Sequence, residues 1–286
     1  MSTVEARAAR GRWPGWGRIL TIAVTLIGAL IILVPIVWAV AGSLKTETDY
    51  REIPIQILPR QISFDAYAKV LRDGSLPRGF LNSIVVATIE VTAVLLTSSL
   101  AGYVFARKMF WGKDALFLFV LASTMVPFTM LLIPLYLQFI ALGFTDNYLA
   151  IALPTAVSAY GIFLCRQFIR GIPRDLFDAA VIDGAGDLAV YREIVLPLAR
   201  PVLSALAIFT LIVSFNSLLW PLVIITDRSL VTLPLVLSAY ARQGEAIVFT
   251  EILAAGVLGS IPLVVAFLVL QRNFVKGISL TGLGGH

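Results

Sequence analysis

Long apolar runs separated by short polar segments dominate this chain. The runs lie at about 19–42, 82–105, 114–141, 147–169, 202–225 and 250–271. Crossing ~30 Å of hydrocarbon takes ~20 helical residues at ~1.5 Å of rise each, so every run is long enough to span a bilayer. Only helices satisfy their own backbone polar groups in lipid, and none of the runs alternates as a barrel strand would. The pattern predicts an all-α membrane protein with six transmembrane helices.

Two runs have features of their own. The third, 114–141, contains Pro127 and Pro134, and we expect it to bend or break because proline removes an amide donor and clashes with the preceding turn. The first follows Arg7, Arg10 and Arg12, as a signal peptide would follow a basic segment. Its core exceeds the ~7–15 apolar residues of a signal sequence, and we interpret it as a retained helix.

Composition agrees with a membrane protein. Of the 286 residues, 59% are hydrophobic and 14% are charged, with a mean hydropathy of +0.92. Soluble domains carry about 25% charged residues. The single cysteine, Cys165, excludes an intramolecular disulfide and is expected to be a small buried residue; with one histidine, no metal cluster is expected.

Lys and Arg give the expected orientation. Most of the 22 lie in segments that would be cytoplasmic if the N-terminus is inside. This bias predicts cytoplasmic tails at 1–18 and 272–286 and a cytoplasmic connection at 170–201. The net charge of +5 comes from basic residues dispersed at the ends of apolar runs, so no nucleic-acid partner is expected. On the other side, residues 43–81 are predicted to include a short amphipathic helix near 64–71.

The cytoplasmic connection is predicted to fold as two short helices. Pro173 opens the first at a position where its missing N–H has no intrahelical partner. Gly184 and Gly186 supply a permissive backbone that ends this helix. The second is expected to run from about Asp187 to Val195, before Pro197.

The same connection carries a long gapped motif. It reads Asp178-Ala179-Ala180-Val181-Ile182-Asp183-Gly184-Ala185, followed by Leu196-Pro197 and Pro201. This spacing resembles the cytoplasmic loop of the permease subunits of ABC importers, roughly E-A-A-x-x-D-G-A and then Leu-Pro and Pro. Asp178 stands where that family usually has Glu, and Tyr191 stands where it usually has Phe.

The resemblance covers about residues 20 to 280 and is greatest to the six-span partner of the maltose-type pair. Further matching segments are Asn82-Ser83, Ala101-Gly102-Tyr103, Phe105-Ala106-Arg107, Val126-Pro127, Ile133-Pro134-Leu135-Tyr136, Gly143-Phe144-Thr145-Asp146, Asn216 with Leu219-Trp220-Pro221-Leu222, and Gln271-Arg272.

The resemblance implies a type I ABC importer permease fold and a place in the bacterial inner membrane. It also implies a second homologous permease, an ATPase dimer, an extracytoplasmic solute-binding protein and surrounding lipid as partners. The cargo would be a sugar or oligosaccharide, with a polyol or glycerol phosphate as the alternative. The residues that would couple to the ATPase are Asp178, Ala179, Ala180, Asp183, Gly184, Ala185, Leu196 and Pro197. The alternative is a loop helix that merely rests on the membrane.

The chain has no phosphate-binding loop that ends in Lys-Ser or Lys-Thr. ATP and Mg²⁺ would therefore belong to separate ATPase chains, and this chain would be neither an enzyme nor a cofactor carrier. A membrane-embedded enzyme would need a cluster of acids, bases or nucleophiles, and Glu90 alone is not one. A secondary transporter would show inverted repeats, which the sequence lacks.

Polar residues within the apolar runs are candidates for the translocation path. Ser83, Glu90 and Thr97 are seven residues apart and share one helix stripe. They would line the path or hydrogen-bond to the partner subunit.

Asn216 and Trp220 lie one turn apart, followed by Pro221, and would offer an amide and an aromatic plate to a sugar ring. Trp220 would otherwise be an interfacial anchor. Thr124, near Pro127, is a further candidate.

The connection 226–249 would, by resemblance, enter the cleft of the binding protein. The residues we expect to make that contact are Asp227, Arg228, Tyr240 and Arg242.

Overall fold

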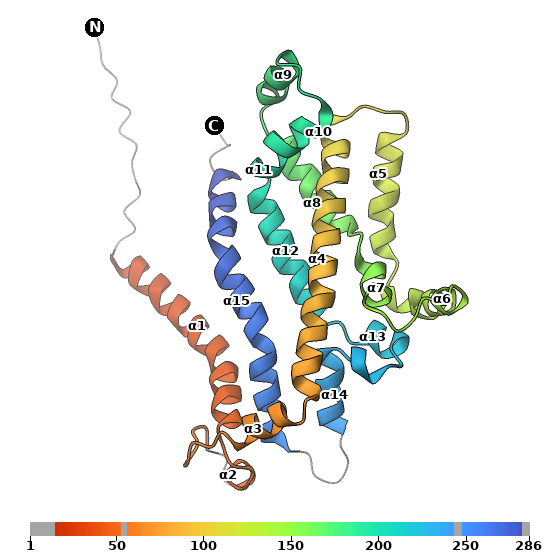
Figure 1. Cartoon of the computed structure of the whole chain (residues 1–286). Helices are drawn as coiled ribbons and strands as arrows, with labels where there is room; N and C mark the ends of the chain where they lie inside the picture. The colour runs from red at the N-terminus through yellow and green to blue at the C-terminus, as the bar shows by residue number, and fades with distance from the viewer. Residues whose placement is uncertain (1–14, 53–55, 243–247, 282–286) are drawn as a thin grey trace.

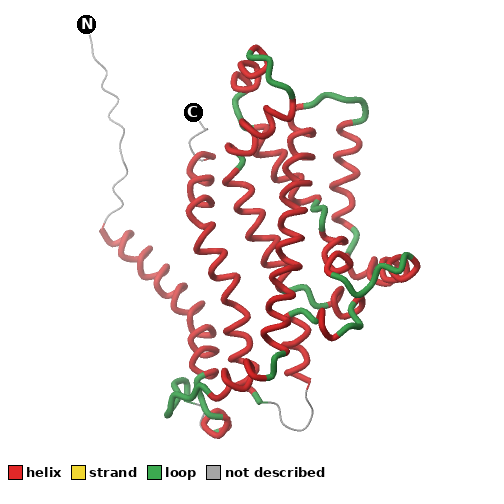
Figure 2. The backbone as a smooth tube through the Cα atoms, in the orientation of Figure 1, coloured by secondary structure: helices red, strands yellow, loops and turns green. Residues whose placement is uncertain are grey.

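The computed structural model describes residues 15–52, 56–242 and 248–281. Every regular element in these ranges is a helix, which Figure 2 shows as a bundle of helices joined by loops. The all-α prediction is confirmed.

Three of the described helices are much longer than the others. They are α1 (Gly15–Ser43), α4 (Ser75–Arg107) and α15 (Phe249–Thr281). Each is long and apolar enough to cross a membrane. In Figure 1, α4 stands at the centre of the bundle, and α15 lies between α1 and α12. α15 continues as a helix for ten residues past the predicted span end at 271. The cytoplasmic tail predicted from 272 therefore begins as part of this helix, and its place relative to the membrane stays a prediction.

Two further apolar runs are bent pairs. The run 114–141 folds as α5 (Lys113–Ala122), the 3₁₀ turn η1 (Ser123–Met125) and α6 (Phe128–Ala141). Its two halves meet at 97°. The break falls at Pro127, whose extended backbone starts α6, whereas α6 continues through Pro134. The run 147–169 folds as α7 (Tyr148–Ala152), η2 (Leu153–Thr155) and α8 (Ala159–Arg170), bent by 53°.

The fifth run is not one helix. It divides into α12 (Arg200–Phe215) and α13 (Leu219–Ile224). The side-chain amide of Asn216 donates to the carbonyl of Ile212 at 2.7 Å and so caps the end of α12. Pro221 lies in the first turn of α13, where a missing N–H costs nothing. The continuous helix predicted for 202–225 is therefore wrong.

Short helices cover the two ends of the bundle (Figure 1). One end holds α2 (Glu47–Arg51), α3 (Asp65–Arg72), η4 (Arg228–Leu230) and α14 (Leu233–Arg242). The opposite end holds α9 (Arg174–Ile182), α10 (Asp187–Val190), η3 (Tyr191–Val195) and α11 (Leu196–Leu198). We call these the α3 end and the α9 end. The amphipathic helix expected near 64–71 is α3. Which end faces the cytoplasm stays a prediction from the Lys and Arg distribution.

Small residues let α4 and α8 pack closely. A Cβ added to Gly102 would lie 2.5 Å from the Cβ of Cys165, and one added to Gly161 would lie 2.3 Å from the Oγ of Ser98. Helix interfaces in membranes favour small residues because they allow backbones to approach. Cys165 is fully buried in this contact, as expected for a small packing residue.

Candidate functional site

The segment between α8 and α12, residues 170–201, forms the α9 end and is called the coupling segment here. Its first helix, α9, ends at Ile182, and Gly184, the residue after the C-cap Asp183, has a φ of +78°. The amide of Gly184 donates to the carbonyl of Val181 at 3.0 Å, and that of Ala185 donates to Ala180 at 2.9 Å. This pair of bonds is a Schellman motif, in which glycine takes the left-handed position without strain. The stop predicted at Gly184 is confirmed. Gly186 has a φ of −74° and requires no glycine.

The second helix of the coupling segment runs past its predicted end. Residues 187–198 continue through Pro197 because the turn before it widens into the π-helix η3. The amide of Leu196 donates to the carbonyl of Tyr191, five residues back. Proline normally clashes with the carbonyl four residues earlier, and the wider turn relieves that clash.

The coupling segment exposes apolar side chains among its polar ones. Ile182 is 85% exposed at the end of α9. We call four of the exposed apolar side chains the apolar tip: Leu176, Val181, Ile182 and Leu188. Exposed apolar side chains on a polar protrusion mark a surface that contacts another protein or the membrane.

The eight predicted coupling residues do not share this face equally. The exposed ones are Asp178, Ala179, Asp183, Gly184 and Pro197, whereas Ala185 and Leu196 are half-buried. Ala180 is 9% exposed and packs inward with Val190 and Tyr191. The resemblance placed Ala180 among the residues that couple to the ATPase, but its methyl group belongs to the core of this chain.

The C-terminal end of α4 holds the coupling segment in place. The guanidinium of Arg107 donates to the carbonyls of Ile169, at 2.8 Å, and Ile172. Its carbon lies 4.1 Å from the ring centroid of Phe177 on α9. One side chain therefore fixes both the end of α8 and the start of α9.

A second set of contacts joins α4 to the other helix of the segment. The hydroxyls of Ser99 and Tyr191 are 2.6 Å apart in the buried core. Lys108 pairs with Asp187, and this hydrogen bond raises the pKa of the lysine. The functions of Ser99, Arg107 and Lys108 could not be predicted from the sequence. Its only indication was that they lie in or beside the Ala101-Gly102-Tyr103 and Phe105-Ala106-Arg107 segments.

The stripe on α4 is made of structural contacts within the chain. Ser83 accepts a hydrogen bond from the amide of Leu233 at 2.8 Å. Thr97 donates to the carbonyl of Ala156 at 3.1 Å. Neither of these bonds needs the partner subunit that the sequence interpretation invoked.

Glu90, the middle residue of the stripe, is 4% exposed and accepts a hydrogen bond from the hydroxyl of Thr155 at 2.7 Å. It also lines a hollow of about 270 Å³ between α4, η2–α8 and α12. Tyr160 and Phe209 stand edge to face in the same hollow, with ring centroids 6.4 Å apart.

Trp220 does not offer an open aromatic plate. It is 2% exposed, and its ring nitrogen donates to the carbonyl of Ala150 at 2.9 Å. The rings of Phe128 and Phe139 meet it edge on. Both interpretations of Trp220, as a sugar plate and as an interfacial anchor, are wrong for this structure, because the indole is enclosed by its own chain.

Asn216 and Thr124 are exposed and lie at helix breaks rather than on a shared face. Asn216 caps α12, and the hydroxyl of Thr124 donates to the carbonyl of Leu121 at 2.7 Å. The one-turn spacing expected between Asn216 and Trp220 is lost because the helix ends between them.

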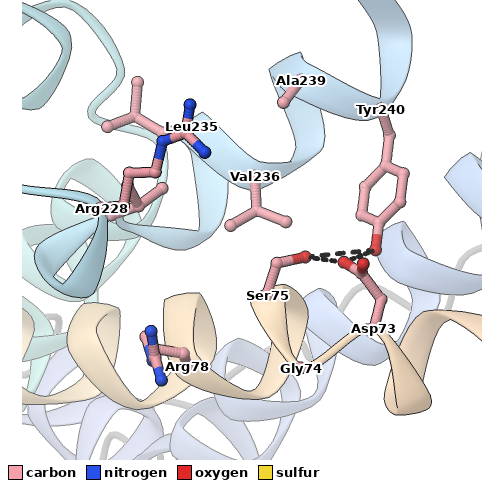
Figure 3. Close-up of a pocket in the computed structure, with 10 residues that line it drawn as sticks. Asp73, Gly74, Ser75, Arg78, Arg228, Leu235, Val236, Ala239 and Tyr240 are labelled. Carbon is pink, nitrogen blue, oxygen red and sulfur yellow. Dashed lines mark hydrogen bonds between the residues drawn. The ribbon is translucent and has the colours of Figure 1, made fainter. Parts of the chain in front are cut away.

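The predicted binding-protein contacts lie at the α3 end, beside a pocket of about 670 Å³. In Figure 3, Tyr240 points from α14 toward Asp73 and Ser75 at the start of α4, while Arg78 and Arg228 flank the pocket. The Tyr240 hydroxyl donates to Asp73 at 3.0 Å. Hydrogen bonds from Ser75, and then from Tyr240, lower the pKa of Asp73.

Asp227 and Asp146 fold this end of the molecule. Asp146 takes a left-handed φ of +49° and accepts hydrogen bonds from the amides of Thr226, at 2.6 Å, and Asp227, at 2.9 Å. These bonds lower the pKa of Asp146. Asp227 in turn accepts from the amide and hydroxyl of Ser229, which lowers its own pKa. Arg242 ends α14, and the residues that follow it, 243–247, lie outside the described part of the chain.

Within the described residues, no group of three or more His, Cys, Asp and Glu side chains is placed to hold a metal ion.

Comparison with known proteins identifies the family. Residues 94–280 match the family described as the binding-protein-dependent transport system inner membrane component. The arabinooligosaccharides transport system permease protein AraQ of Bacillus subtilis is 31% identical, over 90% of this chain and 92% of that protein. The sn-glycerol-3-phosphate transport system permease protein UgpE of Yersinia enterocolitica is also 31% identical, over 88% and 92%.

A solved structure shares the fold. It is a crystal structure of a bacterial ABC transporter involved in the import of the acidic polysaccharide alginate, with a TM-score of 0.81 and 24% identity. The match covers 92% of this chain and 99% of that one. The family match and these relatives show which family this is. The chain belongs to the inner membrane components of binding-protein-dependent transport systems, which are the non-catalytic permease subunits of ABC importers.

Proposed function

We propose that this chain is a permease subunit of an ATP-driven importer that moves a sugar or oligosaccharide delivered by an extracytoplasmic binding protein. The observation that carries the proposal is the apolar tip, held on a braced segment at one end of a membrane-spanning bundle. The relative AraQ is named for arabinooligosaccharides, and the solved neighbour belongs to an alginate importer. Both names support a carbohydrate cargo.

In this proposal the coupling segment docks on a separate ATPase subunit, which carries ATP and Mg²⁺. Closure of the ATPase pair pushes α9, and the contacts of Arg107 and Tyr191 pass the movement to α4. A second, homologous permease completes the path. The ATPase can shift the transporter only by its preference for one conformation over the other.

The hollow beside Glu90 is our candidate for the part of the path contributed by this chain. It combines one carboxyl group with the exposed rings of Tyr160 and Phe209. Aromatic faces contact the apolar face of a sugar ring, while a carboxyl group accepts from its hydroxyls. At the α3 end, the candidates for contact with the binding protein remain Asp227, Arg228, Tyr240 and Arg242.

Glycerol phosphate is the second candidate cargo. The UgpE relative has the same identity to this chain as AraQ, 31%. Binding of the cognate extracytoplasmic protein to a glycan panel that includes glycerol phosphate would distinguish the two. Binding of glycerol phosphate and of no glycan would replace the sugar assignment.

The docking assignment is tested by site-specific cross-linking in native membranes. Cys165 is fully buried, so a cysteine introduced by Ile182→Cys is the accessible thiol for a photoreactive maleimide. The matched control is Ile62→Cys, an exposed isoleucine in the α2–α3 connection near the other end of the bundle. We expect the first variant, and not the second, to capture a chain that binds ATP. Equal capture, or capture by the control alone, would refute the docking assignment.

A further inference from the structure

A basic pocket lies at the α9 end, where α4, α5 and α8 finish or begin. Its volume is about 460 Å³. Its lining includes four cationic side chains and one carboxylate: Lys113, Arg166, Arg170, Arg174 and Asp114. None of the four ion pairs found among the described residues involves any of these side chains. The pocket therefore has an excess of positive charge that the described part of the chain does not neutralise.

One arginine of the pocket is held rigidly. The guanidinium carbon of Arg166 lies 4.0 Å from the ring centroid of Phe117 on α5, and its Nε donates to the carbonyl of Phe105 at 3.3 Å. These contacts orient the side chain but leave its charge uncompensated. Such a preset guanidinium favours a planar or tetrahedral oxyanion, which can accept from two of its N–H groups.

The backbone adds to the positive field. Lys113 is the first residue of α5, and Arg174 is the first residue of α9. A cation at a helix N-terminus opposes the helix dipole. Each first turn also carries one carboxylate, Asp114 in α5 and Asp175 in α9. Neither helix has a side-chain cap on its first turn. Uncapped amides at a helix start bind phosphate groups in many proteins.

The surroundings of the pocket are those of a membrane boundary. Trp111, in the α4–α5 connection, is 99% exposed, and Met109 beside it is also exposed. Along α5, Leu116 and Phe119 present apolar side chains to the outside of the bundle. Tryptophan prefers the depth of the lipid headgroups, with acyl chains below it. A molecule in the pocket would thus have a charged end among arginines and an apolar route along α5.

We propose that this pocket binds the phosphate group of an anionic phospholipid, with Arg166 as the fixed donor and Lys113, Arg170 and Arg174 as further cations. The shared chemistry is a phosphate oxyanion, and the adjoining apolar surface selects the lipid over free phosphate. Because Arg174 begins α9, the bound lipid touches the base of the coupling segment. Basic pockets at the cytoplasmic ends of transmembrane helices recognise anionic headgroups in this way.

The test uses the full chain in nanodiscs of phosphatidylcholine with a minor fraction of phosphatidylglycerol, and counts the lipids retained after transfer to detergent by native mass spectrometry. The variant is Arg170→Gln with Arg174→Gln. Both side chains are exposed and no intrachain hydrogen bond or ion pair holds them among the described residues, so folding should persist. The matched control is Arg192→Gln with Arg200→Gln, which makes the same charge change at the same end outside the pocket.

We expect phosphatidylglycerol to be retained over phosphatidylcholine by the unaltered chain and by the control. Retention should fall by about fivefold for each pocket arginine removed. Equal retention of the two lipids, or unchanged retention in the pocket variant, would overturn the proposal. A separate arm adds inorganic phosphate to nanodiscs that contain only phosphatidylcholine. Saturable phosphate binding there at millimolar concentration, with no preference for phosphatidylglycerol, would assign the pocket to a soluble anion and also overturn it.

Discussion

Arg107 and Phe177 form the contact on which the position of the coupling segment depends. The guanidinium carbon of Arg107 lies 4.1 Å above the ring of Phe177, and the same side chain donates to the carbonyl of Ile169. A residue at the end of the central helix is thereby joined to α9 and to the end of α8. If α9 moves relative to the bundle, either this contact breaks or Arg107 and the end of α4 move with α9.

Replacing Phe177 should loosen α9 without unfolding the bundle. Phe177→Leu keeps an apolar side chain but removes the ring under the Arg107 charge, an interaction of about 0.5–2 kcal/mol. We expect amide exchange across 174–185 to accelerate by roughly two- to thirtyfold, as this energy allows. Tyr160→Leu, which removes an exposed ring far from the segment, is the control. Unchanged exchange in α9 would show that the stack does not hold the helix.

The two glycines of the coupling segment should respond differently to substitution. Gly184→Ala forces a side chain into a left-handed backbone, at a cost of roughly 1–2 kcal/mol. Gly186→Ala meets neither that strain nor a steric contact. We expect only the Gly184 variant to lower uptake relative to ATP hydrolysis, measured in vesicles with the complete transporter. Equal behaviour of the two alanines would show that the stop at Gly184 does not shape the docking surface.

The fold of the α3 end should be insensitive to pH until strongly acidic conditions. The pKa of Asp146 lies below its usual value of 3.8 because the amides of Asp227 and Thr226 donate to the carboxylate. A lowered pKa stabilises the folded state above 3.8, and this contribution is lost as the pH falls through the folded pKa. Exchange protection of residues 226–231 should thus stay constant from pH 8 to about pH 5 and fall below about pH 4.

Asp146→Asn is the matched variant for this effect. Its side-chain oxygen still accepts from the backbone amides, and asparagine tolerates the left-handed backbone. The acid-induced loss contributed by residue 146 should then disappear, while protection at pH 7 persists. A drop of equal size at low pH in the asparagine variant would exclude Asp146 as its source.

Glu90 should tolerate loss of charge better than loss of its acceptor. Glu90→Gln retains an oxygen for the hydroxyl of Thr155, which donates at 2.7 Å. Glu90→Leu removes it, and an unmet buried donor costs about 1–3 kcal/mol. Since Thr155 also donates to the carbonyl of Ala152, the cost should lie at the low end. Thermal unfolding in detergent should show a lower midpoint for the leucine variant alone.

Substrate uptake by Glu90→Gln tests whether the hollow beside Glu90 is part of the translocation path. If the hollow beside Glu90 carries the substrate, Glu90→Gln should change the KM for uptake while the melting midpoint is retained. A KM identical to that of the unaltered chain would restrict Glu90 to its bond with Thr155.

Several features of the site were visible in the sequence because they depend on local chemistry. The end of α9 could be predicted because glycine adopts a positive φ without strain, as Gly184 does. The break at Pro127 could be predicted because proline has no amide hydrogen to donate within a helix. The long bilayer-spanning helices follow from unbroken apolar length. The break at Asn216 was missed because a side chain that caps a helix end looks, in sequence, like any polar residue in an apolar run.

By itself, the sequence determined the helical class, the membrane setting, the family resemblance and the position of the coupling segment, since each rests on residue type and short-range spacing. Tertiary structure alone decided which side chains face outward. Ala180 turned inward while Ile182 stayed exposed, and Trp220 was enclosed by residues from α6 and α7. Side-chain exposure depends on contacts between residues far apart in the chain, and periodicity within one helix does not specify its neighbours.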